Sequence, residues 1–129
     1  MHSEIQILAL FGLLIVVTVC VQAALAIPHF GLKYLVGARD EDVIPKGIVA
    51  RLKRATQNNI ETFTYFAPVV LLIHLQDLGA ESTLLAAQIF LISRLVYVPA
   101  YISGVPFLRT TIWSIGFCAT LYLYFAALL

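Results

Sequence analysis

The chain has 129 residues, of which 61% are hydrophobic and only 12% are charged. Soluble domains average roughly 45–50% apolar and about 25% charged residues, so this composition is typical of a membrane protein. Eight Lys and Arg against seven Asp and Glu give a formal net charge of +1. This balance provides no basic field that could recruit DNA or RNA, which excludes nucleic-acid binding.

The first predicted helix covers residues 5–27, an uncharged apolar block long enough to cross a bilayer. Ala24 and Ala26, near its end, resemble the small residues of a signal-peptide cleavage site. However, residues 1–4 contain no Lys or Arg, and the block exceeds the usual apolar region of a signal peptide. An uncleaved transmembrane helix is therefore expected, and it could continue beyond Pro28 as far as Val36.

The second predicted helix covers residues 47–76. Its uncharged part, residues 62–76, would be about 22 Å long, which is shorter than the roughly 30 Å hydrocarbon core of a bilayer. To cross, the helix must include residues before Glu61. Between Gly47 and Gln76 the only helix breaker is Pro68, and membrane helices tolerate a proline. Asn58 and Glu61 are therefore expected below the membrane surface.

Two further helices are predicted at residues 82–102 and 107–128, separated by Gly104 and Pro106. Because the connections after the second and third helices are short, consecutive helices should be antiparallel neighbours. The predicted fold is all-α: an integral membrane four-helix bundle that forms a single domain over residues 1–129.

The basic residues predict the orientation of this bundle. Most of them lie in or beside the first connection, and Arg109 follows the third helix, whereas the second connection contains Asp77 and Glu81 but no basic residue. By the positive-inside rule, the first and third connections face the cytoplasm and both termini face the opposite side.

Polar residues form one stripe on the second helix and another on the third. At 100° per residue, four residues of the second helix fall within about 80° of arc, and three of the third within about 60°. Arg109 begins the fourth helix from the same side. The two stripes are Arg51, Arg54, Asn58 and Glu61 on the second helix, and Arg94, Tyr97 and Tyr101 on the third.

Simpler explanations exist for each part of these stripes. The basic residues of the second helix could be interfacial anchors that only fix the topology. Glu61 could be a structural counter-ion to Arg94. The two tyrosines of the third helix could belong to an interfacial aromatic belt.

The residue types in the stripes suit a small, zwitterionic, peptide-like anion. Arginines bind carboxylates, a glutamate can hold an ammonium group, and an asparagine can pair with an amide. The sequence has no nucleophile beside a base and no glycine-rich phosphate loop, so a nucleophile would have to arrive with a cosubstrate. We expect no metal site and no disulfide, because Cys20 and Cys118 lie in separate apolar stretches, where we expect both to be buried.

Residues 51–63, RLKRATQNNIETF, resemble the Arg-x-x-Arg-Ala-x-x-Asn-x-x-Glu signature of the MAPEG family, the membrane-associated proteins of eicosanoid and glutathione metabolism. Residues 37–41, GARDE, resemble the bacterial branch of this family. Arg94, Tyr97 and Tyr101, followed by Arg109, support the same resemblance, which extends over nearly the whole chain.

The resemblance implies a homotrimer that binds glutathione between adjacent subunits near the cytoplasmic face, with a lipophilic second substrate or lipid entering from the bilayer. Arg109 matches the arginine that stabilises the glutathione thiolate in enzymatic members. The glutathione-binding residues carried over by position are Arg51, Arg54, Asn58, Glu61, Arg94, Tyr97 and Tyr101.

Two positions depart from the family pattern. Gln57 stands where several family enzymes have a further basic residue, and Tyr97 stands where some have His. The expected function is that of a glutathione transferase or peroxidase-like enzyme of the bacterial inner membrane, acting on lipophilic electrophiles or lipid hydroperoxides. One alternative is a non-catalytic lipid- or protein-binding module of the same fold. A weaker alternative is a transporter or channel subunit, because transporters more often show inverted repeats and this sequence shows none.

Overall fold

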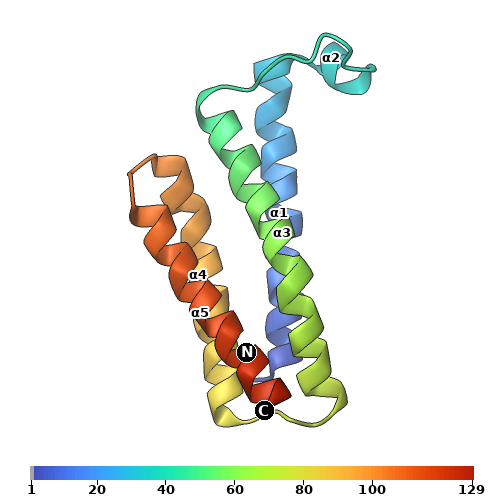
Figure 1. The fold of residues 1–129 in the computed structure, drawn as a ribbon. Helices are drawn as coiled ribbons and strands as arrows, with labels where there is room; N and C mark the ends of the chain where they lie inside the picture. The colour runs from blue at the N-terminus through green and yellow to red at the C-terminus, as the bar shows by residue number, and fades with distance from the viewer. Residues whose placement is uncertain (1) are drawn as a thin grey trace.

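The computed structural model describes residues 2–129, and its regular structure over this range is entirely helical, as predicted (Figure 1). The predicted helix ends differ from the observed ends by three residues or fewer. The helices are α1 (Glu4–Phe30), the short α2 (Leu32–Val36), α3 (Gly47–Leu75), α4 (Glu81–Ser103) and α5 (Leu108–Leu128).

Helix α1 continues past the proline at which the predicted segment stopped. It includes Pro28 and ends where Gly31 adopts a φ of 87° and donates its N–H to the carbonyl of Ile27. A proline in the last turn removes one backbone hydrogen bond, whereas a positive φ cannot continue a right-handed helix. The chain then forms α2 before it turns toward α3.

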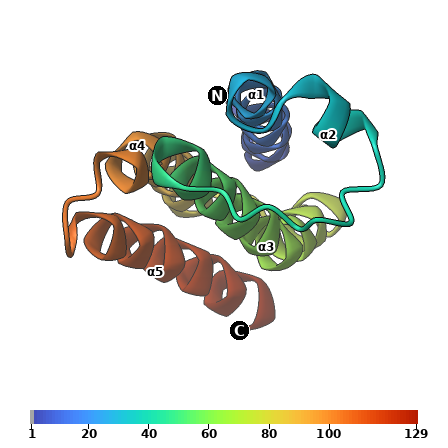
Figure 2. The same cartoon turned by 90° about the horizontal axis from the view of Figure 1, so that it is seen from above.

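The four long helices run alternately up and down. Both termini and the α3–α4 connection lie at one end, and the connection that contains α2 lies at the other end together with the α4–α5 connection (Figure 1). Viewed along the helices, α1 and α5 lie on opposite sides of α3 and α4 (Figure 2). Consecutive long helices are in contact, as the short connections predict.

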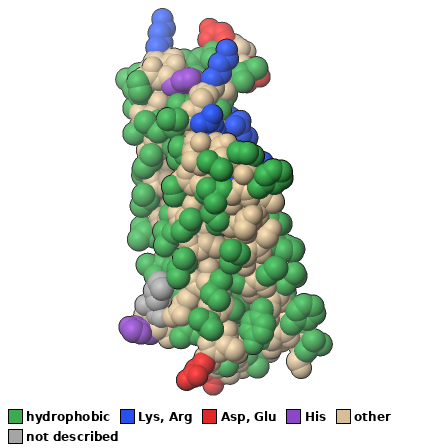
Figure 3. All heavy atoms as spheres, turned by 90° about the vertical axis from the view of Figure 1, so that its left-hand side faces the viewer, with side chains coloured by type: hydrophobic (Ala, Val, Ile, Leu, Met, Phe, Trp, Pro, Cys, Tyr) green, Lys and Arg blue, Asp and Glu red, His purple; other side chains and the backbone are tan. Residues whose placement is uncertain are grey.

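Three of the helices, α1, α4 and α5, are long and apolar enough to cross a membrane. Helix α3 is long enough, at 29 residues, but its first half carries several charged residues. On the side of the molecule shown in Figure 3, apolar side chains cover the middle, and charged side chains gather at the two ends. This distribution is that of a membrane protein.

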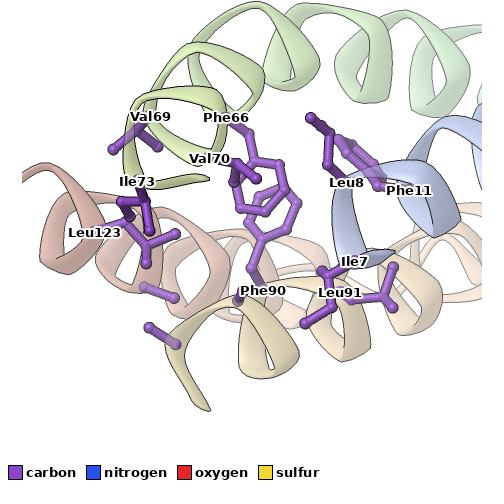
Figure 4. Close-up of a cluster of buried hydrophobic side chains, with 13 residues drawn as sticks. Ile7, Leu8, Phe11, Phe66, Val69, Val70, Ile73, Phe90, Leu91 and Leu123 are labelled. Atoms are coloured by element: carbon purple, nitrogen blue, oxygen red, sulfur yellow. The ribbon is translucent and has the colours of Figure 1, made fainter. Parts of the chain in front are cut away.

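The apolar core lies in the half of the molecule that contains the termini. Phe66 of α3 stacks on Phe90 of α4 with ring centroids 3.7 Å apart, and Phe11 of α1 meets the edge of this pair (Figure 4). Leu123 of α5 is also fully buried in the cluster. The core therefore joins all four long helices, and toward the other end the α1–α3 pair diverges from the α4–α5 pair (Figure 1).

Helices α4 and α5 are in close contact at Gly116. A Cβ atom added to Gly116 would lie 2.5 Å from the Oγ atom of Ser93 and 3.7 Å from the ring of Phe90. The absence of a side chain at this position is therefore required by the close contact of the two helices.

The prediction that both cysteines are buried is wrong. Cys20 on α1 and Cys118 on α5 are exposed on the surface of the single chain. Both lie on apolar outer faces, where helical periodicity alone does not distinguish a residue that faces lipid from one that faces the core.

Candidate functional site

The polar side chains of the predicted stripes meet at the end of the molecule where the helix pairs diverge. Helices α3, α4 and α5 each contribute a part. We call this group the arginine cluster; it consists of Arg51, Arg54, Asn58 and Asn59 of α3, Arg94, Tyr97 and Tyr101 of α4, and Arg109 of α5.

Arg94 is the centre of the cluster, and it is only 1% exposed. Its Nη2 atom donates to the side-chain oxygen of Asn58 at 2.6 Å, and its Nε atom donates to that of Asn59 at 2.8 Å. The guanidinium group also lies over the ring of Tyr97, 4.1 Å from the ring centroid. A buried cation is thus held between two amide oxygens and an aromatic face.

Asn59 is the residue of this cluster that sequence analysis missed. It is fully buried, it accepts from both Nε and Nη2 of Arg94, and its own amide nitrogen has no hydrogen-bond partner. A signal was present, because Asn59 stands directly beside Asn58 in a helix that is expected to enter the membrane. It lies outside the predicted stripe because it is 100° away from Asn58 around the helix.

Tyr101 joins two further arginines of the cluster, Arg54 and Arg109. Its hydroxyl oxygen accepts a hydrogen bond from Nε of Arg54 at 3.0 Å. The guanidinium of Arg109 lies 4.8 Å from the centroid of the same ring. Tyr101 and Tyr97 are in edge contact at 5.7 Å, so the aromatic pair links α3, α4 and α5 around the arginines.

Arg51 is used by the fold itself. Its Nη1 atom donates to the carbonyl oxygen of Ile102 at 3.1 Å, and its guanidinium packs against Gly104. This carbonyl belongs to the last turn of α4, where backbone oxygens lack helical partners and the helix dipole is negative. Arg51 therefore caps the C-terminal end of α4 at the edge of the cluster.

Two of the simpler explanations are wrong. Glu61 is not a counter-ion to Arg94, because the donors of Arg94 point to Asn58 and Asn59, while Glu61 lies on the exposed face of α3. Tyr97 is not an interfacial belt residue, because it is only 2% exposed and packs against Arg94.

The arrangement leaves the cluster with a positive charge that the chain does not neutralise. Within residues 2–129, the partners of the four guanidinium groups are amide, hydroxyl and carbonyl oxygens and aromatic rings. A cation removed from water is costly unless an opposite charge compensates it. The cluster is therefore suited to an anionic ligand.

A groove elsewhere in the described part of the chain lacks charged side chains. It has a volume of about 730 Å³, lies between α4 and α5 and is lined by residues such as Leu85, Ile89, Ile115 and Cys118. No group of three His, Cys, Asp or Glu residues in the described part of the chain could hold a metal ion.

Comparison with known proteins gives a match at the level of a family. No curated protein and no solved structure matches the chain significantly. The sequence model of the MAPEG family, by contrast, matches residues 7–129, which include every residue of the arginine cluster. The chain therefore belongs to the MAPEG family.

Proposed function

We propose that the protein is a membrane-bound glutathione transferase that presents the glutathione thiolate to lipophilic electrophiles, or to lipid hydroperoxides. The observation that carries this proposal is the arginine cluster, in which a buried Arg94 and three neighbouring arginines have only neutral partners. Membership of the MAPEG family suggests glutathione-related or eicosanoid metabolism. Glutathione has two carboxylates, an ammonium group and an ionisable thiol, and this set complements the cluster.

Each residue of the cluster has a distinct role in this proposal. Arg54 and Arg94 bind the carboxylates, because the hydrogen-bond partners of both guanidinium groups among the described residues are neutral. Asn58 accepts from Arg94, which leaves its two N–H donors for a peptide carbonyl of the ligand. Glu61, on the exposed face of α3, binds the ammonium group. Arg51, Tyr97 and Tyr101 complete the pocket and fix the arginines.

Arg109 acts on the thiol. An ordinary thiol has a pKa near 8.5, so only a few per cent is ionised at neutral pH, and a neighbouring cation increases this fraction. A decrease of two pKa units requires about 2.7 kcal/mol of preferential stabilisation of the thiolate. In the transferase reaction the thiol proton leaves to solvent, the sulfur forms a bond to the electrophilic carbon, and the leaving group departs with its electron pair.

The exposed face of α3 supports assembly with further copies of the chain, as a homotrimer. Arg54, Gln57, Glu61 and Thr64 are all exposed, and they fall within about 80° of arc on this helix. A charged residue that faces lipid at the centre of a membrane helix costs roughly 2.5–3.5 kcal/mol on insertion scales. Covering this face with a second copy removes that cost and places the glutathione site between subunits.

The proposed location is the bacterial inner membrane, with the arginine cluster facing the cytoplasm. The end of the molecule that carries the cluster also carries the basic first connection, which the positive-inside rule places on the cytoplasmic side. Both termini then face the opposite side.

Calorimetric titration of the detergent-purified protein with glutathione tests this function, with the ultraviolet absorbance of the thiolate followed in parallel. We expect saturable binding together with a thiolate signal at neutral pH. Arg109→Ala should still bind glutathione, because Arg54 and Arg94 remain, but it should lose the thiolate signal and the turnover of a lipophilic electrophile.

Lys33→Ala is the matched control, because it removes a positive charge from the same end of the molecule but outside the cluster. It should behave as the unmodified protein. Absence of binding at millimolar glutathione would overturn the proposal and favour a non-catalytic binding module. An unchanged thiolate signal in Arg109→Ala would refute the role of that residue alone.

A further inference from the structure

A second cavity with charged walls lies on the other side of α3, away from the arginine cluster. It has a volume of about 570 Å³ and is enclosed by the second half of α1, by α2, by the connection that follows it and by the start of α3. Its charged lining consists of Arg39, Asp42 and Lys53, whose formal charges sum to +1, while most of the remaining lining is apolar.

Lys53 belongs to this cavity although it stands between two arginines of the family signature. At 100° per residue, it is 100° from Arg54 and 160° from Arg51 around α3, so it points to a different side of the helix. There it shares a cavity with Arg39, which the GARDE motif contributes from the first connection. The proposed glutathione chemistry uses neither residue.

Hydrogen bonds to side chains hold the connection over the cavity. The N–H group of Val43 donates to the hydroxyl of Tyr34 at 2.9 Å, and that of Lys46 donates to Nε2 of His29 at 3.4 Å. Arg39 donates from Nε and Nη2 to the carbonyl of Leu35, which leaves its Nη1 without a partner in the described chain. These hydrogen bonds hold the connection, and with it Arg39, beside the cavity.

Arg39 and Asp42 line the cavity at the end formed by the first connection, whereas Lys53 and Gln22 line it further along α3 and α1. The rest of the α1 wall, from Val19 to Ile27, is apolar and covers about 12 Å of helix within the first membrane-spanning segment. Val49 of α3 lines the opposite side. Arg39, at the far end, comes from the connection just outside that span. A ligand that fills this space has an anionic head at the membrane surface and an apolar tail in the hydrocarbon layer.

We propose that this cavity binds an anionic glycerophospholipid of the surrounding leaflet. The phosphate group lies between Arg39 and Lys53, and one acyl chain lies along α1 toward Val19. A phospholipid is favoured over a soluble anion because the apolar wall lies within the membrane-spanning part of α1 and would otherwise have no matching surface. Such a site anchors the first connection to the membrane independently of glutathione.

Native mass spectrometry of the detergent-purified protein tests this site, using dioleoyl phosphatidylglycerol and dioleoyl phosphatidylcholine as probes with identical tails. We expect retention of phosphatidylglycerol in clear preference to phosphatidylcholine. The double variant Arg39→Gln with Lys53→Gln should weaken phosphatidylglycerol binding roughly thirtyfold, since each basic residue near an anionic head group contributes about 1 kcal/mol.

The matched control is Lys33→Gln with Lys46→Gln, which removes the same charge from the same region without touching the cavity lining. It should bind as the unmodified protein does. A second pair of variants tests whether the cavity itself holds the lipid. Ala23→Trp places a large side chain in the cavity and should abolish retention of phosphatidylglycerol. Ala24→Trp lies outside the lining and should not.

Equal retention of the two lipids, or equal losses in both double variants, would overturn the proposal. Binding of glycerol phosphate as tight as that of the lipid would show a site for a soluble anion instead. If the protein retains no lipid and the Ala23→Trp variant dissociates into single chains, the occupant of the cavity is a segment of a second copy. The glutathione titration of the unmodified protein is a separate measurement and does not depend on these outcomes.

Discussion

Arg94 combines complete burial with neutral partners, and this combination governs the behaviour of the site at the scale of single residues. Among residues 2–129, the amide oxygens of Asn58 and Asn59 accept from this cation, and no carboxylate does. The unpartnered amide nitrogen of Asn59 adds a donor that is unsatisfied in the structure. Under the proposed function, these neutral partners leave the charge of Arg94 for an anionic ligand.

Substitutions of Asn59 separate stability from binding. Asn59→Leu removes the acceptor of a charge-assisted hydrogen bond and should lower the free energy of unfolding by about 2–3 kcal/mol. Asn59→Asp places a carboxylate against Arg94; it should raise the thermal midpoint in detergent and weaken glutathione binding at least tenfold. Thermal unfolding and calorimetric titration measure both effects. Undiminished glutathione binding by Asn59→Asp would contradict the assignment of Arg94 to an anionic ligand.

At the scale of the elements, two devices fix the position of α4 relative to its neighbours. Arg51 of α3 caps the carbonyl of Ile102 in the last turn of α4. Gly116 of α5 allows close approach to Ser93 of α4. Since Arg94, Tyr97 and Tyr101 project from α4, any shift of this helix moves half of the arginine cluster.

Gly116→Ala should destabilise the α4–α5 pair. The added methyl group would lie 2.5 Å from Oγ of Ser93, and overpacking of this kind costs about 1–3 kcal/mol. The double variant with Ser93→Ala should recover most of the loss, because the next Ser93 atom is 3.6 Å away. Thermal unfolding in detergent is the measurement. Gly12→Ala on α1, where nothing lies within 4 Å, is the control and should be neutral or slightly stabilising.

For the whole molecule, the decisive feature is the polar face of α3 that the single chain leaves exposed. The apolar core joins the four long helices near the termini, whereas polar contacts connect α3 to α4 at the other end. In the proposed function, such a subunit is closed by packing at one end, and a ligand and a neighbouring copy cover the other end. Assembly and binding then share residues, and a variant can separate them.

Glu61→Gln is that variant. It preserves the shape of the side chain but removes the charge proposed to bind the glutathione ammonium group, so glutathione binding should weaken at least tenfold. The mass of the detergent complex should remain that of three chains, because the amide is less costly than the carboxylate at a covered interface. Thr64→Val, on the same face, should change neither property. Dissociation of Glu61→Gln into single chains would indicate that the polar face serves assembly only.

The sequence by itself determined the membrane class, the four long helices and the residues of the two polar stripes. These properties are local: an apolar run long enough to cross a bilayer and a period of 3.6 residues are readable without any neighbouring helix. Proline and glycine residues near Gly31 and Gly104 also indicated where a helix is interrupted. The exact end of α1 and the short α2 depended on the backbone angles that the chain adopts.

Only the tertiary structure decided which polar residues pair. Arg94 bonds to Asn58 and Asn59, and Glu61, the partner considered from sequence, faces outward. Lys53 lines a cavity that the flanking signature arginines do not line. The physical reason is that side-chain pairing depends on the rotation and axial offset of one helix against another. Both are set by close packing around Phe66, Phe90 and Gly116, which no single segment of the sequence encodes.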